Sequence, residues 1–238
     1  MTSPTIPLTV DGRRIEARPG QTILDATDEA GVYIPRLCWM KQLLPFGSCR
    51  VCTVRVNGRP QAACTQPVAP GMVIENDTAE LRELRRDLID MLFVEGNHFC
   101  MFCAKSGHCE LQALAYRFGI AAPRFPFAFP QRARDASHPG IVLDRDRCVL
   151  CARCVRASRE LDGKTVFGFA GRGPAKSIAV NATEGLGGTD AEAVDRAVSA
   201  CPTGSLMVKR NGFAVPVGER LFDHAPIGST IEPPAAEK

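Results

Sequence analysis

The sequence predicts an α+β protein built from three small domains in a row. Strand and hairpin signals occupy the first third, a helical spacing of three and four follows, and strands mix with helices from Ile141 onward. The eleven cysteines fall into three groups, one in each of these segments. A chain of 238 residues has room for two to three small domains. We therefore predict domains at 1–78, 79–136 and 137–238.

Residues 1–78 are predicted to form a small β-grasp domain. Two hairpins are expected, with strands at 6–10 and 14–17 and then at 51–56 and 61–64. Their turns, Asp11-Gly12 and Asn57-Gly58, are residue pairs that short hairpin loops favour. Between the hairpins, a helix over 22–30 should end at Gly31, because glycine can adopt the left-handed conformation of a C-terminal cap.

Residues 79–136 change from strand to helix signals. Apolar side chains spaced by three and four predict one helix that ends near Gly96 and a second that ends at Gly119. These side chains are Leu81, Leu84, Leu88, Met91 and Leu92 in the first helix, and Leu111, Leu114, Ala115 and Phe118 in the second. The segment 121–134 holds three prolines and three phenylalanines, so it is predicted to be a linker or an extended packing arm.

Residues 137–238 resemble a small ferredoxin unit with a tail. A strand that ends at Leu143 and a helix over 152–161 are expected to surround three closely spaced cysteines. Thr189 and Glu192 have capping-box spacing before a predicted helix over 191–200. A hairpin through Asn211-Gly212 is expected next, and the tail from Pro216 is expected to be a surface arm.

The composition sets limits on location and partners. The net charge of +3 is small and scattered, so it gives no reason to expect nucleic acid as a partner. No apolar run approaches the ~20 residues of a membrane span, and the N-terminus has no secretion signal. We therefore expect a cytoplasmic protein without a membrane segment. In a reducing compartment, tight Cys-x2-Cys pairs favour metal over disulfides.

The first cysteine group has the spacing of a 2Fe-2S site in a β-grasp domain. It consists of Cys38, Cys49, Cys52 and Cys64, with ten, two and eleven residues between them. The two irons of such a cluster need two thiolates each. A zinc site is the alternative, since one Cys-x2-Cys pair and two flanking thiols would also serve zinc.

The second group is one thiolate short of four. Cys100, Cys103 and Cys109 can hold three corners of a 4Fe-4S cluster, and His98 can supply the fourth ligand as a neutral imidazole. His98 could instead be a solvated or capping histidine. His108 is the competing ligand, although its neighbour Cys109 already belongs to the site. We predict that His98 is the ligand.

The third group carries the most specific signal. Cys148, Cys151 and Cys154 match the start of the bacterial ferredoxin motif, whose fourth cysteine precedes proline. The usual fourth position is Ser158 here, and the remaining Cys-Pro pair is Cys201-Pro202. The triplet and Cys201 are therefore predicted to bind one 4Fe-4S cluster.

Arginines accompany the cysteine groups along the chain. They are Arg36, Arg50, Arg147, Arg153 and Arg156. Their charges could offset the negative charge of thiolate-ligated clusters, or they could form an ordinary solvated surface. The sequence does not distinguish these two roles.

No convincing nucleotide site accompanies the cysteines. The segment 168–177 lacks the Gly-Lys-Ser of a phosphate-binding loop, and 185–188 lacks the third glycine of a dinucleotide fingerprint. Both segments are predicted to be turns. A chain with three one-electron centres and no substrate site would receive and deliver electrons through partner proteins.

The three motifs, in this order, resemble the N-terminal part of the large iron–sulfur subunit of respiratory complex I. The resemblance lies in the four-cysteine loop, the His/Cys group, and the segments RCVLCARCVR (147–156) and ACPTG (200–204). Complex I usually has three residues between the histidine and the first cysteine, whereas GNHFC (96–100) has one. The short chain and this spacing look like the diaphorase gamma subunits of cytosolic NAD-reducing NiFe hydrogenases of the Hox type.

This resemblance implies a relay subunit without a catalytic site of its own. Its partners would be an FMN- and NAD(H)-binding diaphorase subunit and the small and large subunits of a NiFe hydrogenase. The flavin is needed there because clusters carry one electron and nicotinamide takes two. The alternatives are an electron-transfer subunit of an NAD-dependent formate dehydrogenase, an FeFe hydrogenase or a complex I-like NADH dehydrogenase, and, in a different class, a zinc-stabilised interaction module.

Overall fold

The computed structural model describes residues 5–210 and 212–233 of the chain. Residues 5–78 form a five-stranded mixed sheet with one helix. The elements are β1 (Ile6–Val10), β2 (Arg13–Ala17), α1 (Ile23–Glu29), β3 (Thr53–Val56), β4 (Arg59–Ala62) and β5 (Val73–Glu75). The strand order is β2-β1-β5-β3-β4, in which only β1 and β5 are parallel among these neighbours. This arrangement is the predicted β-grasp domain.

Both predicted hairpin turns are confirmed. Asp11 and Gly12 have φ angles of 48° and 80°, and Asn57 and Gly58 have 48° and 79°. Positive φ at both central positions defines the type I′ turn, whose twist matches that of the flanking strands. Strand β5 is not predicted, because three residues are too few to show an alternating pattern. It nevertheless lies in the sheet between β1 and β3.

The middle of the chain forms two helices, α2 (Ala79–Val94) and α3 (Glu110–Arg117), as predicted. The Thr78 hydroxyl caps α2 by accepting the Leu81 N–H. Gly119, with a φ of 62°, follows the end of α3. A single 3-10 turn, η1 (Cys100–Phe102), interrupts the loop between the helices. The three-and-four spacing therefore locates both helices correctly.

The segment 121–134 is a packing arm held by charge. Arg124 forms ion pairs with three carboxylates of α2, those of Glu83, Asp87 and Asp90. The Ala128 N–H also donates to the Val94 carbonyl at 2.9 Å. The three phenylalanines of this segment remain exposed. The arm thus follows α2 through polar contacts, and its aromatic side chains do not anchor it.

The last part of the chain contains two small sheets and two helices. Its elements are β6 (Arg134–Asp135), β7 (Ile141–Asp144), α4 (Arg153–Glu160), β8 (Phe167–Ala170), β9 (Ser177–Val180), α5 (Arg196–Ser199) and β10 (Leu206–Val208). One sheet has the order β10-β7-β6, and β8 pairs with β9. The segment 168–177 lies in this β8–β9 hairpin, and 185–188 is a 3-10 turn, η4. The turn prediction is confirmed for 185–188 and for 171–176, whereas 168–170 belongs to β8 and Ser177 begins β9.

The predicted helix over 191–200 is wrong in its first half, since only Arg196–Ser199 is helical. Thr189 forms no capping box there; its hydroxyl donates to the Leu186 carbonyl. Instead, the Asp162 carboxylate accepts the N–H groups of Arg196 and Ala197, both at 2.9 Å. This cap comes from a residue 34 positions earlier, so the local spacing could not reveal it. The predicted turn at Asn211-Gly212 includes Asn211, which lies outside the described residues.

The prediction that the tail from Pro216 is a surface arm is wrong in part, because the tail packs back onto the molecule. Ile227 is buried, and its carbonyl accepts a hydrogen bond from Arg117 of α3 at 2.9 Å. Gly228 has a φ of 101°, and a Cβ there would lie 2.5 Å from the Tyr33 ring. The tail thereby joins α3 to the loop that follows α1.

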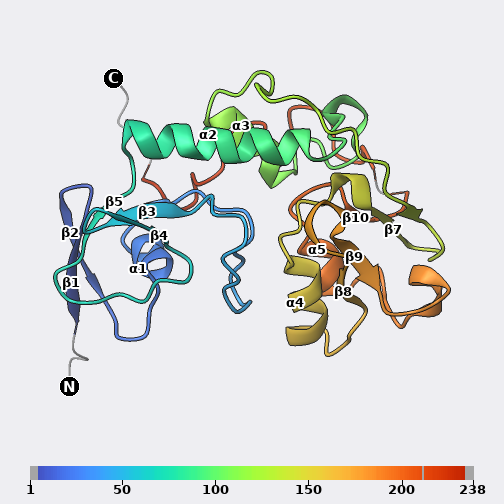
Figure 1. Ribbon diagram of the computed structural model, residues 1–238, viewed down its shortest axis with the longest axis horizontal. Coiled ribbons are helices and arrows are strands. Elements are labelled where there is room, and N and C mark those ends of the chain that lie inside the picture. The colour runs from blue at the N-terminus through green and yellow to red at the C-terminus, as the bar shows by residue number, and fades with distance from the viewer. Residues whose placement is uncertain (1–4, 211, 234–238) are drawn as a thin grey trace.

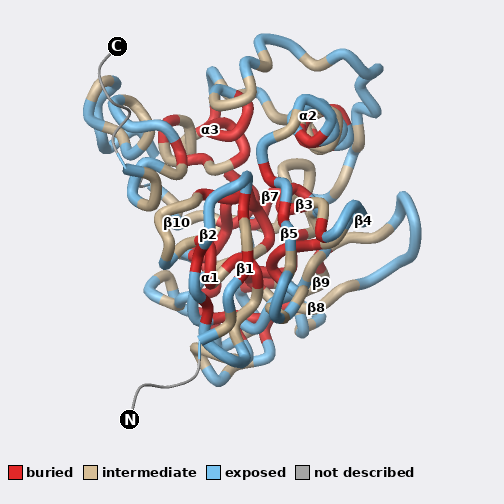
Figure 2. The backbone as a smooth tube through the Cα atoms, turned by 90° about the vertical axis from the view of Figure 1, so that its left-hand side faces the viewer, coloured by how far each residue is buried: buried red, intermediate tan, exposed pale blue. Residues whose placement is uncertain are grey.

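The parts of the chain pack as one unit of α+β structure. Figure 1 shows the β-grasp sheet on one side, the elements from β7 to β10 on the other, and α2 and α3 above them. Figure 2 shows buried residues gathered around α1 and the strands of the β-grasp sheet, and on one side of α2. One hydrophobic core combines Leu37 and Val51 of the first domain, Ile89 and Leu111 of the helices, and Ile227 of the tail. Among the described residues, no helix is long and apolar enough to cross a membrane.

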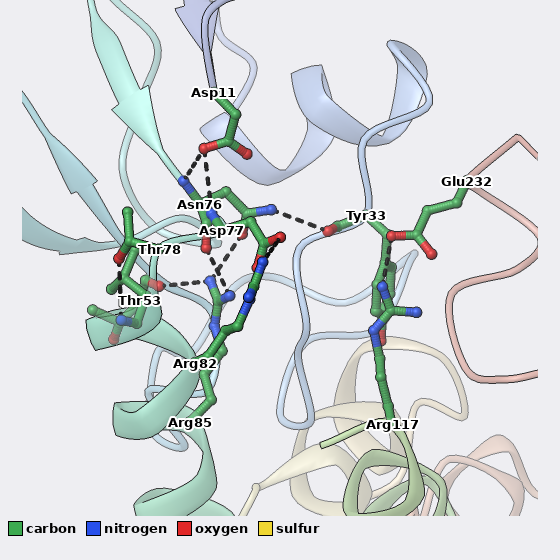
Figure 3. A network of polar contacts seen from close by, with 11 residues as sticks. Asp11, Tyr33, Thr53, Asn76, Asp77, Thr78, Arg82, Arg85, Arg117 and Glu232 are labelled. Atoms are coloured by element: carbon green, nitrogen blue, oxygen red, sulfur yellow. Dashed lines mark hydrogen bonds and ion pairs between the residues drawn. The ribbon is translucent and has the colours of Figure 1, made fainter. Parts of the chain in front are cut away.

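Arg85 fastens α2 to the β-grasp domain. Its side chain is buried and donates to the Val51 carbonyl at 3.2 Å. It also donates to the carbonyls of Thr53 and Asn76 at 2.9 and 2.8 Å, and to the Asn76 side chain at 2.8 Å (Figure 3). Burial lowers the pKa of Arg85 to about 10, so the guanidinium remains charged at neutral pH. Because Val51 adjoins Cys52, these bonds also fix the backbone of the first cysteine site.

Candidate metal centres

The first cysteine group lies where the loop before β3 meets the end of the β3–β4 hairpin. Thiol hydrogen bonds join Cys38 to Cys49 and Cys64, and Cys64 to Cys52. The Cys38 N–H donates to the Cys49 sulfur at 3.3 Å. Three of the thiols are buried, and that of Cys49 is partly exposed. The fold therefore brings together the four thiols that the sequence assigns to the first site.

The second group lines a small cavity between the end of α2 and the start of α3. His98, Cys100, Cys103 and Cys109 all contribute to its wall. His108 is separate from it and lines two other cavities, formed largely with the C-terminal tail. The structure therefore groups His98, and not His108, with the three cysteines.

The imidazole of His98 is half-buried and constrained. Its ring packs edge-on against Phe93, with centroids 5.5 Å apart. The Nε2 atom is buried and has no hydrogen-bond partner among the described residues. Burial, followed by the charge of Arg147, lowers the pKa of His98 to about 4, so the ring is neutral at pH 7. A Cβ at Gly96 would lie 2.5 Å from Nε2, which explains why glycine occupies this position.

The third group surrounds the start of α4 and the end of α5. Cys148, Cys151 and Cys154 follow β7, and Cys201 follows α5, so 46 intervening residues separate the last two in sequence. Cys154 and Cys201 lie in the same hydrophobic core, with Cys148 packed against it. The Leu206 N–H donates to the Cys201 sulfur at 3.4 Å. The structure thus brings the remote cysteine to the triplet.

Three residues between the cysteines have left-handed backbone angles. Arg50, Leu150 and Ala152 have φ angles of 58°, 51° and 59°, which side chains other than glycine adopt rarely. Each lies inside a Cys-x2-Cys segment. The turn at Leu150 directs its N–H to the Cys148 sulfur, 3.4 Å away. Strained residues of this kind persist at sites whose geometry matters for function. The residue types at these three positions do not indicate positive φ angles.

The residues of the three sites fit iron–sulfur clusters, whose usual ligands are cysteine thiolates. Burial raises the pKa of Cys109 and Cys151 to about 12 and that of Cys148 to about 11. Thiol hydrogen bonds lower the pKa of Cys38 and raise that of Cys64 in the first site. Buried thiols therefore become ligands only when a cationic partner replaces their protons. In the described part of the chain, no three His, Cys, Asp or Glu side chains converge as ligands of a single metal ion would.

Arg153 connects the surroundings of all three sites. It precedes Cys154, and its buried guanidinium forms a two-pronged ion pair with Glu110 at 2.5 and 2.7 Å. Glu110 follows Cys109 of the second site. The same guanidinium donates to the carbonyl of Trp39, which follows Cys38 of the first site, at 2.7 Å.

Arg156 adds a second link between the first and third sites. Its guanidinium donates to the Cys38 carbonyl at 2.6 Å and to the Cys151 carbonyl at 3.5 Å. The side chain is buried. Arg153 and Arg156 therefore lie between the sites and do not form a solvated surface. The sequence shows arginines near cysteines, but nothing in it indicates Glu110 or the three backbone carbonyls as their partners.

Comparison with protein families supports the three-part organisation. Residues 3–79 match a 2Fe-2S iron–sulfur cluster binding domain. Residues 85–124 match the NADH-ubiquinone oxidoreductase-G iron–sulfur binding region, and 141–208 match a 4Fe-4S single cluster domain. The chain thus contains one 2Fe-2S domain followed by two 4Fe-4S domains.

Two curated relatives differ in how much of their own length the chain covers. The chain is 41% identical over 220 residues to the gamma subunit of the NAD-reducing hydrogenase HoxS from Cupriavidus necator, covering 92% of this chain and 94% of that subunit. It is also 33% identical to the 78 kDa subunit of mitochondrial NADH-ubiquinone oxidoreductase from Candida albicans, over 87% of this chain and 29% of the longer protein. The second match therefore covers only a part of its relative.

A solved structure supports the match to the hydrogenase gamma subunit. The fold superposes on a chain of the crystal structure of an NAD+-reducing [NiFe]-hydrogenase in the H2-reduced state, with a TM-score of 0.90. Sequence identity is 47%, and the match covers 93% of this chain and 94% of that one. Sequence identity, matching length and fold all agree. The chain therefore belongs to the family of gamma subunits of NAD-reducing hydrogenases.

Proposed function

We propose that this chain relays single electrons between a NiFe hydrogenase module and an FMN- and NAD(H)-binding diaphorase subunit. The observation that carries the proposal is the contact of three cysteine sites through buried residues next to their ligands. Iron–sulfur clusters, when bound, supply one-electron redox centres. The match to hydrogenase gamma subunits along nearly the whole chain supports these partners.

Each proposed domain would hold one cluster. Cys38, Cys49, Cys52 and Cys64 would bind a 2Fe-2S cluster in domain 1–78. His98, Cys100, Cys103 and Cys109 would bind a 4Fe-4S cluster in domain 79–136. Cys148, Cys151, Cys154 and Cys201 would bind another in domain 137–238. The shared cavity of His98 and the three cysteines supports the imidazole ligand.

The chain's own residues hold these sites together and keep them from solvent. Most of the cysteines are buried, and none of the eleven forms a disulfide bond. Cysteines without disulfides suit the reducing cytoplasm, where we propose that the protein works. The Arg153–Glu110 pair fixes the second and third sites relative to each other.

The proposal is tested by purifying the native complex under anaerobic conditions and identifying its partners. We expect a flavin- and nicotinamide-binding subunit together with the two NiFe hydrogenase subunits. The complex should reduce NAD+ with hydrogen as the electron donor, but not with formate. Formate-dependent NAD+ reduction, or co-purification with a formate dehydrogenase subunit, would contradict the hydrogenase assignment and favour the formate alternative.

A further inference from the structure

The second and third sites touch through residues next to their cysteines. The Glu110 N–H, after Cys109, donates to the Pro202 carbonyl, after Cys201, at 2.9 Å. A Cβ at Gly204 would lie 2.6 Å from the Cys103 sulfur. Glycine is therefore needed there, since a larger residue would displace this thiol. The third domain thus forms part of the wall of the second site.

Arg147 carries a positive charge across this contact. It precedes Cys148 of the third site, yet its Nη1 lies 3.4 Å from the Cys103 sulfur of the second site. Its side chain lines the same cavity as His98 and is only 17% exposed. The Thr203 hydroxyl donates to the Arg147 carbonyl at 2.8 Å. Arg147 is therefore held in place by Thr203, another residue of the third domain.

The charge of Arg147 lies beside several groups of the second site, because its side chain lines the same cavity as His98, Cys100 and Cys103. The Asp144 carboxylate lies 3.5 Å from the Arg147 Nε and offsets part of this charge. The guanidinium nevertheless presents its Nη1 to a sulfur, where a donor favours negative charge.

We propose that Arg147, supplied by the third domain, raises the reduction potential of the cluster held in the second site. The proposal rests on the proposed function, because it requires a cluster ligated by Cys103. Reduction makes a cluster more negative, so a nearby cation and a hydrogen bond to a ligand sulfur favour the reduced state. The third domain would thus adjust how readily its neighbouring site accepts an electron.

The test is a redox titration of the purified native complex, followed by electron paramagnetic resonance. In R147Q, the midpoint potential of the second-site signal should move to a lower value, with little change at the other two clusters. In R147K, which keeps the charge but loses the planar fork, it should move less. The matched control is R145Q. Arg145 lies in the same 3-10 turn, η2 (Arg145–Arg147), but donates to the carbonyls of Ile178 and Ala133.

The outcomes separate this inference from the proposed function. An unshifted second-site potential in R147Q, or an equal shift in R145Q, would overturn the role of Arg147. Absence of any second-site cluster signal in the unmodified complex would count against the proposed function instead. If R147Q does not retain the cluster, R147K and Thr203→Val replace it. Both should lower the potential by a smaller amount, and an unchanged potential in both would overturn the inference.

Discussion

Replacing His98 by alanine is expected to alter one 4Fe-4S signal in electron paramagnetic resonance and to leave the other two centres intact. The substitution removes the only imidazole that lines the cavity of Cys100, Cys103 and Cys109 within the described structure. Hydrogen-dependent NAD+ reduction should fall by more than about tenfold, since even outer-shell changes at metal sites cost about 10–100-fold. The spectrum and the rate are measured on the same anaerobic preparation.

His108→Ala is the matched control for this experiment. His108 is adjacent to Cys109 in sequence, but it lines other cavities near the tail. Its removal should leave all cluster signals unchanged. An unchanged spectrum in His98→Ala, with a changed one in His108→Ala, would reverse the ligand assignment. The pair of variants therefore decides between the two histidines.

Replacing Arg85 by methionine is expected to lower the free energy of unfolding by several kcal/mol, since each buried acceptor left without its donor costs about 1–3 kcal/mol. The change leaves the buried carbonyls of Val51, Thr53 and Asn76 without their donor. Because Val51 adjoins Cys52, the visible absorption of the 2Fe-2S cluster should also be lost at a lower urea concentration than in the unmodified protein. Urea unfolding, followed by this absorption and by circular dichroism, measures both effects.

Arg82→Met controls for the loss of a positive charge on the same helix. Arg82 pairs with Asp77 at 2.6 Å, but both side chains are more than half exposed (Figure 3). Exposed ion pairs contribute little, so the unfolding curve should hardly move. If Arg85→Met and Arg82→Met had equal effects, the buried network would have no special role in joining α2 to the sheet.

Local chemistry explains what could be predicted from the sequence. The Asp11-Gly12 and Asn57-Gly58 turns fix two hairpins because their backbone angles are set within two residues. The spacing of Cys148, Cys151 and Cys154 locates a site because these ligands follow one another in one loop. The same holds for α2 and α3, whose apolar faces repeat at helical spacing.

Long-range contacts explain what could not be predicted. The cap of α5 comes from Asp162, and the tail is held by Arg117, so neither shows in a local pattern. The Arg153–Glu110 pair joins residues 43 positions apart. The sequence places an arginine beside a cysteine, but only the fold decides whether its charge faces solvent or a neighbouring site. For Arg147, Arg153 and Arg156, the structure shows the second arrangement.

The central claim is that three cysteine-rich sites make this chain a relay of iron–sulfur clusters. The most direct test is the iron, acid-labile sulfide and zinc content of the anaerobically purified protein. One 2Fe-2S and two 4Fe-4S clusters predict a brown protein with about ten irons and about ten sulfides per chain, and no stoichiometric zinc. A colourless protein that contains zinc and no sulfide would contradict the claim and identify a zinc-stabilised interaction module.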